Sequence, residues 1–114
     1  MPPETRVVRA DGVEGWLYPV TTPCGDRYEL FAWFDGSGYQ VRVVVPDLWA
    51  RDDLHACHLF RDARICFGAW EGGGLLTLDG AYAASVLWAR GFSAYRRGGR
   101  FTFHAGDTPC PISS

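Results

Sequence analysis

The clearest hydrophobic pattern lies over residues 39–45, where apolar and polar side chains alternate with the period of a half-buried β-strand. Two earlier segments, 13–20 and 28–34, are rich in β-branched and aromatic residues and also predict strands. Turn-forming residues separate the three, over 21–26 and 35–38. Pro19 has no backbone N–H and predicts an edge or a strand end. The order indicates an antiparallel β-meander.

A second hairpin is predicted further along the chain. Residues 54–60 and 64–67 flank a tight turn over 61–63. Such a turn favours Gly after Asp62, and an Ala63 with positive φ costs about 1 kcal/mol. Residues 47–53 predict irregular structure or one helical turn, and the triple glycine at 72–74 predicts a flexible loop.

One helix is predicted, over residues 78–90, because small and apolar side chains recur there at intervals of three and four. Asp79 is the expected N-cap and Gly91 the expected stop. Residues 101–103 predict a short strand or a packed loop. The whole pattern predicts an α+β fold, an antiparallel β-meander backed by one main helix.

Composition limits the functional classes. The 114 residues predict a single domain over 1–114, and 47% hydrophobic residues suffice for a core. A formal net charge of -2 argues against nucleic acid or an acidic membrane as a partner, and no apolar run is long enough to span a bilayer. The first residues resemble no secretory signal, which predicts a cytoplasmic, bacterial protein. All 11 basic residues are Arg, so the chain has no Lys.

Four cysteines, Cys24, Cys57, Cys66 and Cys110, raise the question of disulfides or metal. With a sufficient core and no export signal, we expect free thiols. The cluster of His55, Cys57, His58 and Cys66 has zinc-ligand chemistry, but adjacent strand residues point to opposite faces, so no metal site is predicted.

The stretch from His58 to the helix resembles the ubiquitin-conjugating enzyme (E2) family. Ile65-Cys66-Phe67 is similar to the family's catalytic segment, Trp70 to its downstream Trp, and Leu76-Thr77-Leu78 to its entry into a helix. Upstream, Thr22-Pro23 with Gly25 is similar to the family's Thr-Pro hairpin. The resemblance covers about residues 13–91, and it rests on the order in which these motifs follow one another along the chain.

The resemblance implies a minimal E2-like fold, and it implies that Cys66 is the catalytic nucleophile. The modifier, a ubiquitin-like protein, would arrive as a thioester from an activating (E1-like) enzyme and pass to an amine of a target protein. The carrier itself needs no cofactor, because the activating enzyme uses the ATP.

The chain departs from the family in three ways. Residues 1–12 lack the N-terminal helix that contacts the activating enzyme, and much of the C-terminal helical part is absent. The family's His-Pro-Asn tripeptide is not intact, and no Asn is available in its place. His58 is the candidate replacement, since imidazole donates a hydrogen bond to an oxyanion and accepts a proton; packing or capping of the hairpin is its other interpretation.

Two alternatives remain open on the sequence. The first is an E2-like module that has lost catalysis and only binds a ubiquitin-like protein or a partner enzyme. The second is an unrelated thiol or zinc protein of α+β fold. Cys66 also fits a buried small apolar residue, and Arg96, Arg97 and Arg100 fit solvated charge.

Overall fold

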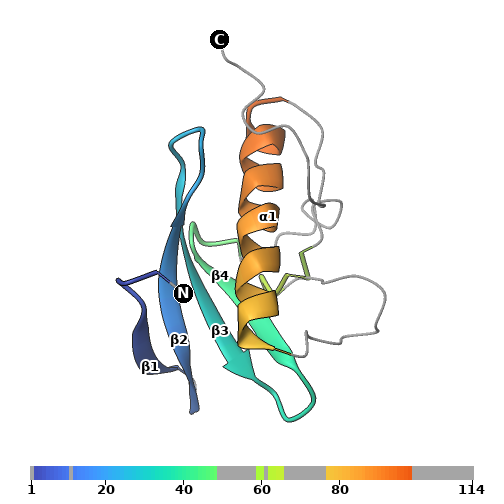
Figure 1. Ribbon diagram of the computed structural model, residues 1–114. Helices are drawn as coiled ribbons and strands as arrows, with labels where there is room; N and C mark the ends of the chain where they lie inside the picture. Colours follow the sequence, from blue (N-terminus) through green and yellow to red (C-terminus); the bar gives the residue numbers. More distant parts are fainter. Residues whose placement is uncertain (1, 11, 49–58, 61, 66–76, 99–114) are drawn as a thin grey trace.

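The fold is an antiparallel sheet covered on one face by a helix, as a computed structural model of residues 2–10, 12–48, 59–60, 62–65 and 77–98 describes it. Its elements are β1 (Arg6–Ala10), β2 (Val13–Thr21), β3 (Arg27–Phe34), β4 (Tyr39–Val45) and α1 (Leu78–Arg96). The strands pair antiparallel in the order β1-β2-β3-β4, and α1 lies along one face of the sheet (Figure 1). The predicted α+β meander backed by one main helix is confirmed.

Strand alternation places one set of side chains under α1. Tyr18 lies opposite Leu30, and Val20 opposite Tyr28, on β2 and β3. These four and their neighbours on β4 are buried in one cluster with α1. The members of the cluster that lie on the strands are Tyr18, Val20, Tyr28, Leu30, Ala32, Val41 and Val43. Burial of this face against the helix is the main source of stability in the described chain.

Strand β1 was not predicted, because it buries little. Four of its five residues are exposed, so no apolar alternation marks it in the sequence. It pairs with β2 only from Val13 to Leu17. Pro19 therefore lies beyond the end of β1, where β2 is locally an edge strand that tolerates a missing N–H. The edge interpretation is confirmed, whereas the strand continues to Thr21.

The helix begins at Leu78 as predicted, whereas its predicted N-cap and its predicted end are wrong. The side chain of Thr77, not Asp79, caps α1, and its hydroxyl accepts a hydrogen bond of 2.9 Å from the amide of Gly80. Asp79 lies in the first turn. Gly91 does not stop the helix, which continues to Arg96. An interior Gly costs about 1 kcal/mol, and the burial of Phe92 against the sheet offsets this cost.

Aromatic contacts join the C-terminal half of α1 to the sheet. Trp88 is fully buried, and its ring stacks on Phe92 with centroids 4.9 Å apart. The ring of Tyr28 meets Trp88 edge to face at 5.8 Å. Among the described elements, α1 lacks the combination of length and apolar character that crossing a bilayer requires. The C-terminal end of α1 lies beside the β2–β3 connection (Figure 1).

Candidate functional site

The predicted hairpin before Cys66 lies against β4. We name it the Ala63 turn (residues 59–65, with residue 61 outside the described set). The amide of Val43 donates to the carbonyl of Ala63, and the amide of Ile65 donates to the carbonyl of Val41, both at 2.9 Å. Leu59 bridges to Ile65 within the turn. The turn therefore extends the sheet beyond β4 and fixes the backbone immediately before Cys66.

Ala63 has a φ of 66°, in the left-handed region that favours glycine. The predicted positive φ is confirmed. The residue is 2% exposed and its amide donates to the carbonyl of Phe60, so burial and hydrogen bonding hold the unfavourable conformation.

Asp62 ties this turn to two arginines. Its carboxylate accepts from Nε of Arg64 at 2.9 Å, and the guanidinium of Arg42 lies 3.5 Å away. Arg42 also donates through Nε to the backbone carbonyl of Asp62 at 3.0 Å. Because the three side chains are 25 to 31% exposed, the arrangement contributes orientation more than stability.

Two stacked aromatic rings on the face of the sheet opposite α1 contact the side chain of Arg42. The guanidinium of Arg42 lies 5.2 Å from the ring centre of Trp33, and Trp33 stacks on Phe31 at 5.7 Å. The ring of Phe31 occupies the space above Gly15, where an added Cβ would lie 2.7 Å from it. The stacked side chains therefore connect Arg42, which contacts the Ala63 turn, with Gly15 on β2, two strands away from β4.

The two residues that sequence reasoning placed in the catalytic site, Cys66 and His58, lie outside the described residues. Trp70 and the zinc-like cluster lie outside them as well. The described neighbours Leu59 and Ile65 are 3% and 0% exposed. Both candidates are therefore bonded, directly in sequence, to core residues of the Ala63 turn.

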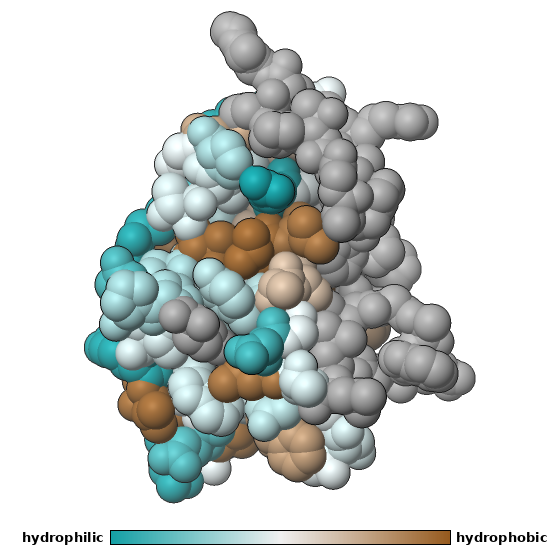
Figure 2. All heavy atoms as spheres, viewed as in Figure 1, coloured by the Kyte–Doolittle hydropathy of each residue, from teal (hydrophilic) through white to brown (hydrophobic). Residues whose placement is uncertain are grey.

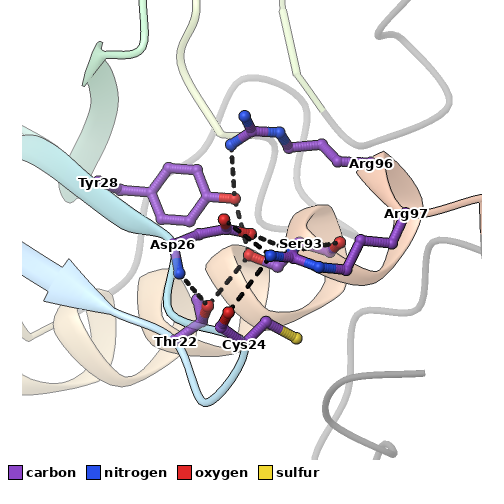
Figure 3. Close-up of polar contacts among 7 residues, drawn as sticks. All are labelled: Thr22, Cys24, Asp26, Tyr28, Ser93, Arg96 and Arg97. Atoms are coloured by element: carbon purple, nitrogen blue, oxygen red, sulfur yellow. Dashed lines mark hydrogen bonds and ion pairs between the residues drawn. The ribbon is translucent and has the colours of Figure 1, made fainter. Parts of the chain in front are cut away.

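A second polar cluster lies at the other end of the sheet, around the β2–β3 connection. We name this connection the Cys24 turn (residues 22–26) (Figure 3). The amide of Gly25 donates to the carbonyl of Thr22, and the amide of Thr22 donates to the carbonyl of Asp26, both at 2.8 Å. Gly25 has a φ of 90°, which the turn requires and glycine supplies.

Ser93 of α1 is the buried centre of this cluster (Figure 3). Its hydroxyl shares a hydrogen bond of 2.8 Å with Tyr28 and one of 3.2 Å with Thr22. Arg96 donates to the hydroxyl of Tyr28 at 3.4 Å. Ser93 and Tyr28 have no exposed surface, so these bonds satisfy hydroxyls that burial removes from water.

Arg97 closes the cluster from the C-terminal end of α1. Its guanidinium binds both carboxylate oxygens of Asp26 and donates to the carbonyl of Cys24 at 3.2 Å. The hydrogen bonds from Arg97 lower the pKa of the Asp26 carboxyl, and the carboxylate in turn raises the pKa of Arg97. Arg97 is exposed, as expected of a solvated charge, but it is also paired with Asp26, and this pairing was missed because the two residues lie 71 positions apart.

Cys24 is disulfide-bonded, which corrects the expectation of free thiols at this position. Its three possible partners are Cys57, Cys66 and Cys110, all outside the described residues. A disulfide in an intracellular protein is typically transient, catalytic or redox-sensing, whereas stable disulfides are typical of oxidising compartments.

Other features of the described residues support no separate site. A shallow groove of about 160 Å³ beside β1 and β2 has charged residues of both signs, so its charges do not favour one kind of ion; its lining is Glu4, Arg6, Leu17, Tyr18, Pro19, Arg27 and Glu29. Within the described set, no three metal-ligating side chains converge. The described part of the face in Figure 2 has separate apolar patches among hydrophilic side chains.

Comparison with known proteins adds no relationship: no family model matches the chain, and no curated protein or solved structure is significantly similar to it. The class that the structure defines is an α+β domain with a four-stranded antiparallel meander and one covering helix.

Proposed function

We propose that this protein is an E2-like carrier of a ubiquitin-like modifier, with Cys66 as its nucleophile. The observation that carries the proposal is the hydrogen bonding of Ile65 to Val41, since it fixes the backbone to which Cys66 is joined. The order of elements also supports it. The Thr22-Pro23 sequence falls between β2 and β3, the Ala63 turn follows β4, and Thr77 caps the helix that covers the sheet.

The chemistry requires two acyl transfers. In the first, the thiolate of Cys66 attacks the thioester carbonyl of the modifier on an activating enzyme, and the enzyme's thiol leaves. In the second, an amine of the target attacks the new thioester, loses a proton, and releases Cys66 as a thiol. ATP is consumed only by the activating enzyme, so the carrier uses no cofactor.

His58 has a specific role in the second transfer. The carbonyl oxygen becomes negative in the tetrahedral intermediate, and a positioned donor lowers the barrier. Imidazole supplies such a donor, and in its neutral form it accepts the proton that the amine loses. His58→Ala should therefore leave thioester formation intact and slow discharge to an amine by roughly tenfold to a thousandfold.

The proposal implies a cytoplasmic protein, because the activating enzyme works where ATP is available. Its partners are an activating enzyme, the modifier and a target protein. The disulfide of Cys24 must then be compatible with carrier function, either as a transient bond or as one that leaves Cys66 free.

The test combines the purified protein with ATP, an E1-like activating enzyme and a ubiquitin-like modifier. We expect a covalent adduct that thiol reductant removes. Cys66→Ser should form a slower, reductant-resistant ester, and Cys66→Ala should form nothing. Because the chain has no Lys, a stable amide on the carrier can form only at its α-amino group, which keeps the two readouts separate.

Cys57→Ala is the matched control and should form the reductant-sensitive adduct normally. An adduct on folded Cys66→Ala, or its loss in folded Cys57→Ala, would contradict the assignment. Binding of the modifier without any adduct in the wild type would instead support the E2-like binding module that has lost catalysis.

A further inference from the structure

Strand β1 forms one margin of the described sheet (Figure 1). Among the described residues it pairs with β2 alone, and the register over Arg6–Ala10 is regular from end to end. In an antiparallel strand, alternate residues point their N–H and C=O groups to opposite sides. The groups that point away from β2 therefore face outward from the sheet, where an extended segment of another chain can bond to them.

The side chains of β1 are exposed on both faces of the sheet. Val7 is 61% exposed, more than any other large apolar side chain among the described residues. Arg6, Arg9 and Ala10 are exposed as well, and only Val8 is partly buried. An exposed valine retains apolar surface, and a strand docked beside β1 would remove part of that surface from water. The margin therefore combines outward-facing backbone groups with apolar surface.

The charge of β1 is entirely positive. Arg6 and Arg9 are its only charged residues, although the chain as a whole has a formal net charge of -2. Within the described part of the chain, neither arginine forms an ion pair. Arg9 lies opposite Glu14 of β2, but its guanidinium donates to the carbonyl of Gly12 at 3.3 Å. Both guanidinium groups are therefore available to a carboxylate of another molecule.

These arginines disfavour a second copy of β1 as the partner. In an antiparallel pair of two β1 strands centred on Val8, the two copies of Arg9 would be diagonal neighbours about 7 Å apart. Like charges at this distance repel, and basic side chains on an edge strand oppose pairing between identical edges. An acidic strand makes the same interactions attractive. We infer that β1 docks an extended acidic segment of a partner protein as an additional strand of the sheet.

The spacing of the two arginines sets the sequence pattern of the docked segment. Arg6 and Arg9 are three positions apart, so they lie on opposite faces of the sheet. The residues directly opposite them on the docked strand are also three positions apart, with one carboxylate on each face. The two positions between them lie opposite Val7 and Val8 and favour apolar, β-branched side chains. The required pattern is acidic-apolar-apolar-acidic, in its simplest form Glu-Val-Val-Glu.

The test measures binding of short fluorescein-labelled peptides to the full chain by fluorescence anisotropy. The peptide Thr-Glu-Val-Val-Glu-Thr is compared with Thr-Gln-Val-Val-Gln-Thr, which has the same shape and no charge. We expect the acidic peptide to bind about fivefold more tightly, because each of two exposed charge pairs contributes about twofold. Raising NaCl from about 50 mM to about 500 mM should remove most of this preference. Equal binding of the two peptides, or no binding at about 1 mM, would overturn the inference.

Variants assign the preference to β1. Arg6→Gln combined with Arg9→Gln should remove it, and Arg6→Glu combined with Arg9→Glu should transfer it to the peptide Thr-Arg-Val-Val-Arg-Thr. Both positions are exposed, so the melting temperature should change by no more than about 3 °C. Arg27→Gln is the matched control, because Arg27 is also exposed and lines the groove beside β1 and β2. An equal loss of preference in Arg27→Gln would place the peptide in that groove and overturn the inference.

N-methylation of the acidic peptide tests strand pairing separately from charge. A strand bonds to its neighbour through the amides of one edge, so methylating one alternate set of amides should abolish binding, whereas methylating the other set should not. Chemical shifts of the protein amides should change most at Val7 and Val8 and little at Ser85 on α1. Equal effects of the two methylated sets would overturn the inference.

The oligomeric state of the free protein completes the test. We expect a monomer by analytical ultracentrifugation, because the arginines of β1 repel a second copy. A dimer that the acidic peptide dissociates would assign this margin to a second copy and overturn the inference. The docking surface goes beyond the proposed carrier function, and none of these measurements depends on thioester formation, so the two proposals fail separately.

Discussion

The Ala63 turn and the Cys24 turn are held by the same chemistry in different surroundings. Each uses an aspartate bound by arginine, Asp62 with Arg42 and Arg64 in one and Asp26 with Arg97 in the other. The first is held from the outer face of the sheet, where its ion pairs are partly exposed. The second is held from the interior, through the fully buried hydroxyl of Ser93.

The two turns have different structural roles. The Ala63 turn orients the backbone before Cys66, and its support runs outward through stacked side chains to Gly15. The Cys24 turn anchors the C-terminal end of α1 to the sheet and carries a disulfide. One turn fixes the backbone before Cys66 and the other contains the disulfide-bonded Cys24, and substitutions that affect only one of them test this division.

The largest effect is expected from Gly15→Ala. The new Cβ would lie 2.3 Å from the carbonyl oxygen of Ala32 and 2.7 Å from the ring of Phe31, so the backbone or the stack must move. We expect a loss of about 3 kcal/mol in the free energy of unfolding. Hydrogen exchange should accelerate at the amide of Val43, which bonds to Ala63, more than at the amide of Gly25. Equal acceleration at both amides would show that the turns are not independent.

Ser93→Ala should produce the next largest effect and act on the other turn. The substitution removes a partner of two buried hydroxyls, on Thr22 and Tyr28. Tyr28 keeps Arg96 as a partner and Thr22 keeps the amide of Asp26, so the cost is that of two lost hydrogen bonds, about 2 kcal/mol. Exchange at the amide of Gly25 should accelerate while that of Val43 follows global stability. Ser85→Ala, which removes a partner of Tyr18, is the control for loss of a buried hydroxyl elsewhere on α1.

A matched pair of substitutions should shift stability in opposite directions. Ala63→Gly relieves a φ of 66° and should stabilise the protein by about 1 kcal/mol, less the extra backbone entropy of glycine. Gly25→Ala places a Cβ at a φ of 90° and should destabilise it by about 1 kcal/mol, although nothing lies within 4 Å. Denaturant midpoints of the two variants measure the signs directly. Destabilisation by Ala63→Gly would contradict the view that Ala63 stores strain.

The smallest effect concerns pH and Asp26. Hydrogen bonds from Arg97 lower the pKa of this carboxyl in the folded state. Its contribution is therefore complete above the unfolded-state value of about 4 and is lost as the pH falls through the lower folded value. Asp26→Asn should cost about 1 kcal/mol or less at pH 7 and should flatten the loss of stability in acid.

Asp35 is the control for that measurement. Gln40 and the amides of Ser37 and Gly38 lower the pKa of Asp35 as well, so Asp35→Asn should retain the acid-sensitive component of Asp26. If Asp26→Asn loses as much stability between pH 5 and pH 2 as the wild type does, the pair of Asp26 and Arg97 does not stabilise the Cys24 turn.

Much of the sheet was predictable, because strands with one buried face have alternating apolar and polar residues in their sequence. The strand over 39–45 was predicted with its observed bounds, and those over 13–20 and 28–34 differ from the structure by one residue each. The exposed β1 leaves no such pattern. Gly91 misled the prediction of the helix end, because local propensity favours a stop there while burial of Phe92 and Ser93 extends the helix.

The features of the two turns also differ in how far the sequence predicts them. The positive φ of Ala63 was predictable from the spacing of a two-stranded turn. The clasp between Asp26 and Arg97 was not, because charge alone does not say which distant arginine the fold brings near. Cys66 and His58 remain predictions from the sequence, because both lie outside the described residues.

The sequence separation of these contacts has a consequence for the order of folding. Asp62 and Arg64 are two positions apart, and the meander joins strands that follow one another in the chain. Arg97 must close a loop of 71 positions to reach Asp26. Loop closure of this length is entropically expensive, and local contacts form first. Nascent chains therefore assemble the sheet, with its Ala63 and Cys24 turns, before the end of α1 docks, and the ion pair between Asp26 and Arg97 forms only after synthesis has passed Arg97.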